Sequence, residues 1–218
     1  MTKQLIDIAF TNYATAFSSV ELPVLAALNR ETHLKTEQPV MLSGHLQGNL
    51  LQLLSHMIRP RRILELGTFT GYSAICLAQG LGADGHLHTI ELNEELEDTC
   101  RKYFREAGVA DKITLHIGKA AEIVPALDEQ WDIVFLDADK TNYSTYFDMV
   151  FDRIPLGGYI IADNVLFEGK VMLPENEQGK NGAAMHAFNL KIRQDSRVQH
   201  ILLPIRDGIS VIRKISDH

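Results

Sequence analysis

The feature that most constrains the fold of this chain is an alternation, starting near residue 62, of short apolar runs with longer amphipathic segments. The apolar runs have the length of buried strands, and the segments between them have the length and spacing of helices. Such strand–helix–strand alternation predicts a doubly wound, mostly parallel α/β sheet with helices on both faces. The expected strands are 62–66, 86–90, 112–117, 131–136 and 157–162, and the expected helices are 71–80, 93–107, 119–127 and 142–152.

Three segments depart from this alternation. Residues 4–58 have apolar side chains at three- and four-residue spacing, which predicts a helical preface. Near the carboxyl end, Asp207-Gly208 is a tight-turn signal between two β-rich runs, 198–205 and 209–215, which predicts an antiparallel hairpin and a sheet of seven strands. The polar segment 168–182 is rich in Gly, Asn and Glu. It predicts a mobile loop, with residues 170–182 a candidate substrate lid.

Size and charge restrict the class of protein. With 218 residues, 45% of them hydrophobic, we expect one domain over 1–218, made of a preface (1–58) and a Rossmann-like sheet (59–218). The net charge of −7 argues against a broad nucleic-acid surface. No apolar run approaches the roughly 20 residues of a membrane helix, and residues 1–7 lack a secretory signal, so we expect a cytoplasmic protein. The two cysteines, Cys76 and Cys100, lie on helical segments and are predicted to be buried packing thiols.

A glycine-rich turn joins the first predicted strand to the next helix. Ligands of open α/β sheets bind at the carboxyl ends of the strands. Gly67 and Gly71 allow the backbone to approach a ligand, and the following helix amino terminus favours a carboxylate. Their G-x-x-x-G spacing differs from the G-x-G-x-x-G of pyrophosphate binding, which disfavours NAD or FAD. Taken alone, the turn also fits a tight connection without a ligand.

Two later positions add to this site. Glu91 ends the second strand, where a carboxylate can accept hydrogen bonds from both hydroxyls of a ribose. The alternative for Glu91 is an acid near a helix start, because Asn93 and two glutamates follow it. After the third strand, residues 118–121 include Ala120 and offer small side chains beside an adenine, or equally a good helix start.

Oxygen-bearing side chains follow the fourth and fifth strands. Asp137 ends the fourth strand and Asp163-Asn164 ends the fifth, so all three side chains are expected at one rim of the sheet. Hard oxygen ligands without Cys or His suit Mg²⁺, Ca²⁺ or Mn²⁺. Asp139 has a simpler explanation as the cap of the next helix.

These residues belong to runs that resemble the cation-dependent O-methyltransferase family, which includes catechol and caffeoyl-CoA O-methyltransferases. The resemblance extends from about residue 44 to the last strand, and the terminal hairpin is typical of class I methyltransferases. The motifs are specific in combination. The runs that carry it are LELGTFTGYS (64–73), FLDADKTNY (135–143) and DNVLFEG (163–169).

The resemblance implies an enzyme that transfers a methyl group from S-adenosylmethionine to a hydroxyl of a catechol-like small phenol. It implies that Asp137, Asp163 and Asn164 bind a divalent cation, Mg²⁺ being preferred. Lys140 would be the general base, with Asp137 beside it as the second catalytic residue. It also implies a homodimer, with the helical preface as candidate interface. The implied cofactor contacts are Met41, Glu65, Gly67, Phe69, Ser73, Glu91, Leu92, Ala120 and Asp137.

The chain departs from the family pattern at Phe167, where many members carry Trp. This leaves the shape of the substrate pocket and the regiochemistry open. A methyltransferase of hydroxylated uridine in transfer RNA is the alternative within the superfamily, and the acidic net charge disfavours it. A NAD-binding oxidoreductase is disfavoured by the glycine spacing. A scaffold that only binds a cofactor would not need the oxygen ligands or Lys140.

Overall fold

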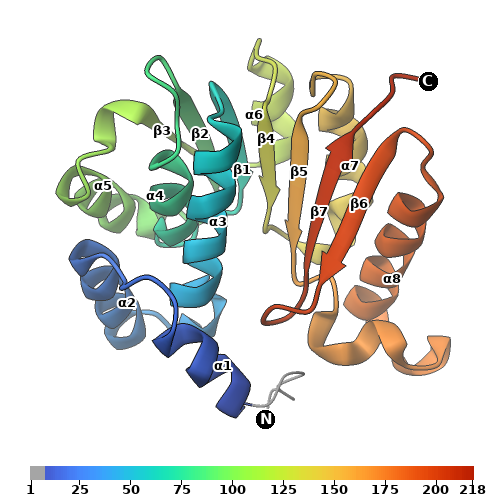
Figure 1. Cartoon of the computed structure of the whole chain (residues 1–218), viewed down its shortest axis with the longest axis horizontal. Coiled ribbons are helices and arrows are strands. Elements are labelled where there is room, and N and C mark those ends of the chain that lie inside the picture. The colour runs from blue at the N-terminus through green and yellow to red at the C-terminus, as the bar shows by residue number, and fades with distance from the viewer. Residues whose placement is uncertain (1–7) are drawn as a thin grey trace. The chain divides into compact units, whose positions relative to one another are not determined.

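The computed structural model describes residues 8–218, which divide into two compact units (Figure 1). The first unit is Thr11–Ala126, and the second is Leu127–His218, to which residues 8–10 also belong. The predictions for residues 1–7, that the preface starts near Gln4 and that no secretory signal is present, lie outside the described residues. Within residues 8–218, no helix combines the length and apolar character needed to cross a membrane.

The helical preface is confirmed, but as several short elements. It comprises α1 (Ile8–Ala16), α2 (Pro23–Lys35), a 3-10 turn η1 (Pro39–Met41) and α3 (Gly44–Ile58). Helix α2 begins with Pro23, whose missing N–H costs nothing at a helix start. Helix α3 ends at Ile58, and the next residue, Arg59, has a left-handed φ of 54° and donates its backbone N–H to the Ser55 carbonyl. Pro60 follows and disfavours further helix.

The first unit contains three parallel strands. Strand β1 pairs with β2 in the register Arg62↔His86 to Leu66↔Ile90, and β2 pairs with β3 from Leu87↔Ile113. Helix α4 is buried at every residue, consistent with its place between β1 and β2 along the chain. The elements in order are β1 (Arg62–Leu66), α4 (Tyr72–Ala78), β2 (His86–Glu91), η2 (Glu94–Leu96), α5 (Glu97–Glu106), η3 (Ala110–Lys112), β3 (Ile113–Ile117) and α6 (Ala120–Ala126).

The second unit carries the other four strands and the predicted hairpin. Strand β4 is parallel to β5, whereas β7 is antiparallel to both β5 and β6. All seven strands form one mixed sheet with the order β3-β2-β1-β4-β5-β7-β6, so the predicted fold class is confirmed. The elements in order are β4 (Ile133–Leu136), η4 (Lys140–Asn142), α7 (Tyr143–Phe151), β5 (Tyr159–Asp163), η5 (Phe167–Met172), η6 (Glu175–Glu177), α8 (Gly179–Gln194), β6 (Val198–Leu203) and β7 (Ile209–Lys214).

The segment 168–182 is more regular than the loop that we expected. It forms the 3-10 turns η5 and η6 and the first turn of α8, which runs alongside β6 in Figure 1. Gln178 is buried and donates its side-chain N–H to the Leu173 carbonyl at 2.9 Å. This side chain therefore supplies the hydrogen bond that a helix or strand partner would otherwise give to that carbonyl. The polar composition of this segment therefore reflects turns held by side-chain hydrogen bonds.

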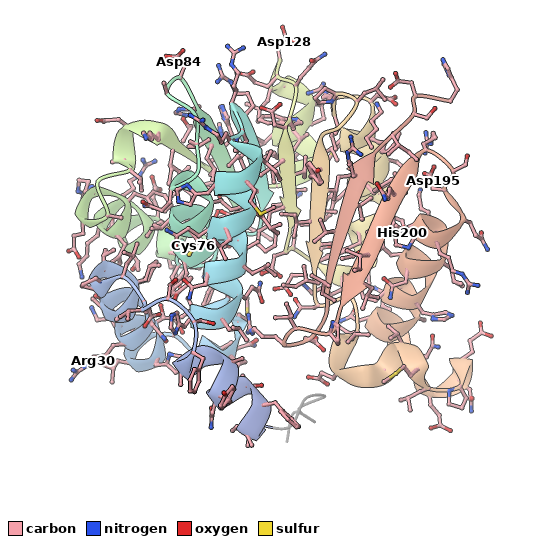
Figure 2. The ribbon with its side chains drawn as sticks, viewed as in Figure 1. Arg30, Cys76, Asp84, Asp128, Asp195 and His200 are labelled. Atoms are coloured by element: carbon pink, nitrogen blue, oxygen red, sulfur yellow. The ribbon has the colours of Figure 1, made fainter. Side chains whose placement is uncertain are left out.

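Both cysteines are buried and free, as predicted. Figure 2 labels Cys76 in α4, where every residue is buried. Burial raises the pKa of the Cys76 and Cys100 thiols above their ordinary value. Both thiols therefore stay protonated and unreactive at neutral pH, in agreement with a packing role.

Gly80, which follows α4, lies directly against the backbone of α3. A Cβ atom at Gly80 would lie 2.2 Å from the backbone carbon of Ser55 and 2.4 Å from the backbone nitrogen of His56. The obstacle is backbone, which cannot rotate away as a side chain can. The first unit therefore needs glycine at this position.

Gly80→Ala should lower the free energy of unfolding by about 2 kcal/mol or more, because an added methyl group must displace packed helices. The matched control is Gly82→Ala, whose Cβ atom would lie 3.7 Å from its nearest neighbours. Urea unfolding of both variants and of the parent chain measures the difference. Equal stability of the two variants would show that α3 and α4 are not packed as described.

Candidate active site

The predicted cofactor turn in the first unit is held against the end of β2. The backbone N–H groups of Gly67 and Thr68 both donate to the Ile90 carbonyl, at 3.0 and 3.2 Å. Gly71 has a φ of 94°, and a Cβ atom there would lie 2.7 Å from the Phe104 ring. Glycine is thus required at Gly71 both by the backbone angle and by the close approach of α5.

Glu91 holds this turn in place through its carboxylate. Oε2 accepts the Phe69 N–H at 2.7 Å, and Oε1 accepts the N–H groups of Leu92 and Asn93 at 2.9 Å each. The capping of the following turn falls to Asn93, whose side chain accepts the Glu95 N–H. A carboxylate offers about four acceptor sites, so about one remains for a ribose hydroxyl. The ribose contact stays a prediction, and the second hydroxyl would have to share an acceptor site that is already occupied.

The other predicted cofactor residues of the first unit differ in exposure. Glu65 is buried, and its Oε2 accepts the Thr89 hydroxyl at 2.5 Å. Ser73, the second residue of α4, is also buried. The side chains of Met41 and Leu92 are 52% and 70% exposed, and Ala120 is the half-buried first residue of α6. The described contacts thus join Gly67, Phe69 and Glu91 at one turn, while the roles of all these residues remain proposals.

Residues that the sequence did not single out also fix this turn. The Thr32 hydroxyl of α2 donates to the Thr70 hydroxyl at 3.0 Å, and both residues are buried. The Tyr72 hydroxyl donates to Glu21 at 2.5 Å. No spacing rule could have found these pairs, because 38 residues separate the two threonines and 51 separate Glu21 from Tyr72.

In the second unit, the structure brings the proposed cation ligands to neighbouring strand ends. Strands β4 and β5 are in register at Leu136↔Ala162, so the next residue along each strand is Asp137 and Asp163. Asn164 follows with a left-handed φ of 56°, and its backbone N–H donates to Asp163 Oδ1 at 2.7 Å. The predicted convergence at one rim of the sheet agrees with this register.

Lys140 reaches this cluster from the turn after β4. Its Nζ donates to Asp137 Oδ1 at 2.9 Å, and the side chains of the two residues are only 15% and 18% exposed. Burial raises the pKa of Asp137, and the nearby Asp163 adds to this, although Lys140 opposes both effects. Burial works to lower the pKa of Lys140, but Tyr143, Asp137 and Asp163 outweigh it and hold that pKa above its ordinary value. Without a cation, Lys140 is therefore an ammonium group.

The chemistry of this donor set fits a divalent cation. Asp163 is buried and raises the pKa of the partly buried Asp137, so a doubly positive ion at these strand ends would offset the negative charge gathered there. Within residues 8–218, no three His, Cys, Asp or Glu side chains are grouped as a metal site. The oxygen-only ligand set of Asp137, Asp163 and Asn164 stays a prediction.

Tyr143 is a residue of this cluster for which no role is predicted from the sequence. Its side chain is fully buried at the start of α7. The hydroxyl lies 2.8 Å from Lys140 Nζ, which donates to it, and 3.0 and 3.1 Å from the carbonyls of Leu136 and Asp163. One hydroxyl thus joins Lys140 to the ends of both β4 and β5.

Asp139 does not make the helix-capping hydrogen bond that its position in the sequence suggests. It occupies the position before η4, but its side chain makes no bond to the backbone of that turn. Its carboxylate instead accepts the Tyr146 hydroxyl at 2.5 Å and the side-chain N–H of Asn142. Asp139 is exposed, and its bonds stay within the turn and α7.

Comparison with known proteins identifies the class. The pattern of the O-methyltransferase family matches residues 15–215, nearly the whole chain. The chain therefore belongs to the O-methyltransferase family. The prediction made from the three sequence runs is confirmed at this level.

Particular relatives point to one branch of that family. The chain is 35% identical to probable caffeoyl-CoA O-methyltransferase 2 of Dictyostelium discoideum, over 94% of this chain and 91% of the relative. It is 32% identical to caffeoyl-CoA O-methyltransferase 1 of Eucalyptus globulus, over 86% and 80%. Among solved structures it resembles the O-methyltransferase TomG of Streptomyces achromogenes, in complex with SAM, with a TM-score of 0.86 and 30% identity over 95% and 96%.

Tyr143→Phe should lower the free energy of unfolding by about 1–3 kcal/mol, because two strand-end carbonyls and the Lys140 ammonium lose a buried partner. Tyr146→Phe is the matched control, since its hydroxyl bonds the exposed Asp139 and its loss should cost about 0.5 kcal/mol. Chemical denaturation of both variants tests the difference. A smaller loss for Tyr143→Phe than for Tyr146→Phe would contradict the bonding described.

Proposed function

We propose that the chain transfers a methyl group from S-adenosylmethionine to a hydroxyl of a catechol-like small phenol, with the help of a divalent cation. The observation that carries the proposal is the cluster of Asp137, Asp163 and Asn164 at neighbouring strand ends, with Lys140 bonded to Asp137. A fold scaffold alone has no need of partly buried acids beside a lysine. Mg²⁺ is the preferred ion, and Ca²⁺ and Mn²⁺ suit the same ligands.

The first unit supports the choice of methyl donor. S-adenosylmethionine would supply the methyl group, and the SAM complex of TomG is a precedent in a chain of the same fold. In this chain, Glu91 fixes the turn at Phe69, and Gly67 lets the backbone come close to a ligand. The start of α4 with Ser73 would face the amino-acid end of the donor. Glu65, Met41, Leu92, Ala120 and Asp137 complete the proposed cofactor contacts.

The second unit supports the choice of acceptor. A divalent cation held by Asp137, Asp163 and Asn164 would bind two neighbouring oxygens and lower the pKa of one hydroxyl, which favours a catechol over a simple phenol. The protein residues would fix the position of that ion, because both acids follow paired strands. Orientation of the hydroxyl is then the main contribution of this unit.

Lys140 is the residue that we propose accepts the hydroxyl proton, at Nζ. The hydrogen bonds from Nζ to Asp137 and Tyr143 fix its position within the cluster. In the cation-free protein Asp137 and Asp163 help to keep Lys140 protonated. Positive charge bound at those carboxylates would oppose their effect on Lys140 and favour its neutral form, as a general base requires.

Methyl transfer should require both the cation and Asp137. After treatment with EDTA, the protein should not methylate caffeate, protocatechuate or caffeoyl-CoA. Added Mg²⁺ should restore turnover, which is measured by chromatography of the methylated product. Asp137→Asn should reduce turnover by about 100-fold or more, because even indirect partners of a metal ligand are worth 10–100-fold. Asp139→Asn is the matched control and should retain activity, since Asp139 bonds only to its own turn and helix.

Two outcomes would contradict the proposal in different ways. Turnover that resists EDTA and survives Asp137→Asn would remove the cation from the mechanism. Binding of S-adenosylmethionine without turnover of any catechol, whatever the cation, would instead favour the hydroxylated uridine of transfer RNA as the substrate.

We also propose that the chain is a homodimer that associates through its helical preface. More than half of the exposed large apolar side chains in residues 8–218 lie in residues 8–57, and α1 has no buried residue. Tyr13 and Phe17 stack on each other, with ring centroids 4.2 Å apart, while Phe17 stays 75% exposed. Such a concentration of apolar surface is typical of an interface.

Light scattering of the purified chain should give twice the monomer mass, and Phe17→Glu should shift the population toward monomer, because a charge would have to be buried. The control is Leu156→Glu, which places the same charge at an exposed leucine outside the preface. A monomeric parent chain, or equal effects of the two variants, would contradict this interface.

A further inference from the structure

The loop that follows β5 is fastened to the turn that precedes β7. Three backbone N–H groups of the loop donate to the turn: Val165 to the Gly208 carbonyl at 3.1 Å, and Leu166 to the Asp207 carbonyl at 2.9 Å. The third, from Glu168, donates to Asp207 Oδ1 at 2.6 Å. The residues on the two sides are about 40 positions apart in the chain, so the contact is tertiary.

Glycine is needed on one side of this junction. Gly208 has a φ of 87°, and a Cβ atom there would lie 2.6 Å from Leu166 Cγ and 2.9 Å from the Leu166 nitrogen. A side chain at Gly208 would therefore push the loop away from the turn. The junction depends on close contact between two backbones.

The backbone at this junction is strained. Six non-glycine residues within 8–218 have positive φ, and four of them lie here: Asn164 (56°), Phe167 (43°), Glu168 (54°) and Arg206 (51°). Each such residue costs about 1–3 kcal/mol unless its surroundings hold it in place, and such residues cluster at functional sites. The loop is held by its hydrogen bonds to Asp207 and Gly208 and by the bond from Asn189 Nδ2 to the Val165 carbonyl at 2.7 Å.

Asp207 also bonds the side chain of Asn164. Asn164 Nδ2 donates to Asp207 Oδ2 at 3.3 Å. An ionised carboxylate only accepts hydrogen bonds, so it selects the N–H end of the amide. The oxygen of Asn164 is then the end left for a cation, which an amide nitrogen cannot bind.

From this geometry we infer that Asp207 is a positioning residue that fixes the orientation of the Asn164 amide for cation binding. The inference rests on the cation site of the proposed function and adds to it a residue that touches neither cation nor substrate. The two carboxylate oxygens of Asp207 have different roles. Oδ1 holds the loop at Glu168, and Oδ2 orients Asn164.

Binding of Mn²⁺ to the purified chain, followed by the electron paramagnetic resonance of the free ion, tests this without catalysis. Asp207→Asn keeps the size of the side chain and can still accept from Glu168, but its N–H group would face the N–H group of Asn164. We expect a dissociation constant for Mn²⁺ about 10-fold or more above that of the parent chain. The control is Asp195→Asn, at the α8–β6 connection labelled in Figure 2, which should change binding less than twofold.

The Asp207→Asn substitution, made in a chain that already carries Asn164→Asp, distinguishes orientation of the Asn164 amide from general support of the loop by Asp207. In Asn164→Asp the ligand offers oxygen from either end, so its orientation no longer depends on Asp207. Adding Asp207→Asn in that background should leave Mn²⁺ binding unchanged or strengthen it, because one of two facing carboxylates is removed. Equal weakening in both backgrounds would show that Asp207 only supports the loop, and would overturn the inference.

The test also distinguishes this inference from the proposed function. A parent chain that binds no Mn²⁺ would refute the cation site itself, and the inference with it. A parent chain that binds Mn²⁺ as tightly as Asp207→Asn does would refute the inference alone.

Discussion

Both units of this chain place carboxylates at the ends of buried strands, and both must compensate the charge of those carboxylates. A buried charge is costly unless hydrogen bonds or an opposite charge compensate for it. The first unit compensates with hydrogen bonds: Glu91 gathers three backbone N–H groups, and Glu65 accepts the Thr89 hydroxyl. In the second unit, Lys140 faces Asp137, whose pKa stays raised beside Asp163. The first arrangement fixes a turn, and the second suits a bound cation.

Much of the fold could be predicted because buried parallel strands leave a strong signal. The run Ile133–Leu136 is continuously apolar, since both faces of its strand are covered. The hairpin followed from Asp207-Gly208 between two β-rich runs. The positions of Asp137 and Asp163 followed from strand order along the chain, because the carboxyl ends of parallel strands share one rim. For the same reason Glu91 was placed beside the glycine-rich turn.

The features that could not be predicted depend on contacts between distant residues. Helix α8 is not among the predicted helices. The polar residues around Gly179 indicate a loop, although Met185, Phe188 and Ile192 are buried at helical spacing. The Thr32–Thr70 bond, the three contacts of the Tyr143 hydroxyl and the Asp207 bonds involve common residue types at no fixed spacing. Such partners are chosen by the packing of whole elements, which a local pattern does not contain.

Selection for heat tolerance and selection for turnover would change this chain in different ways at the strained loop. Glycine adopts a left-handed backbone without steric cost, so glycine at Phe167 or Glu168 would relax the folded state there. The same replacement would free the loop beside Asn164 to adopt other shapes. A population screened only for survival at high temperature would accept such changes, whereas one screened for product would lose them. The frequency of glycine at these positions in the first population, divided by its frequency in the second, would measure how far the stiffness of this loop serves catalysis.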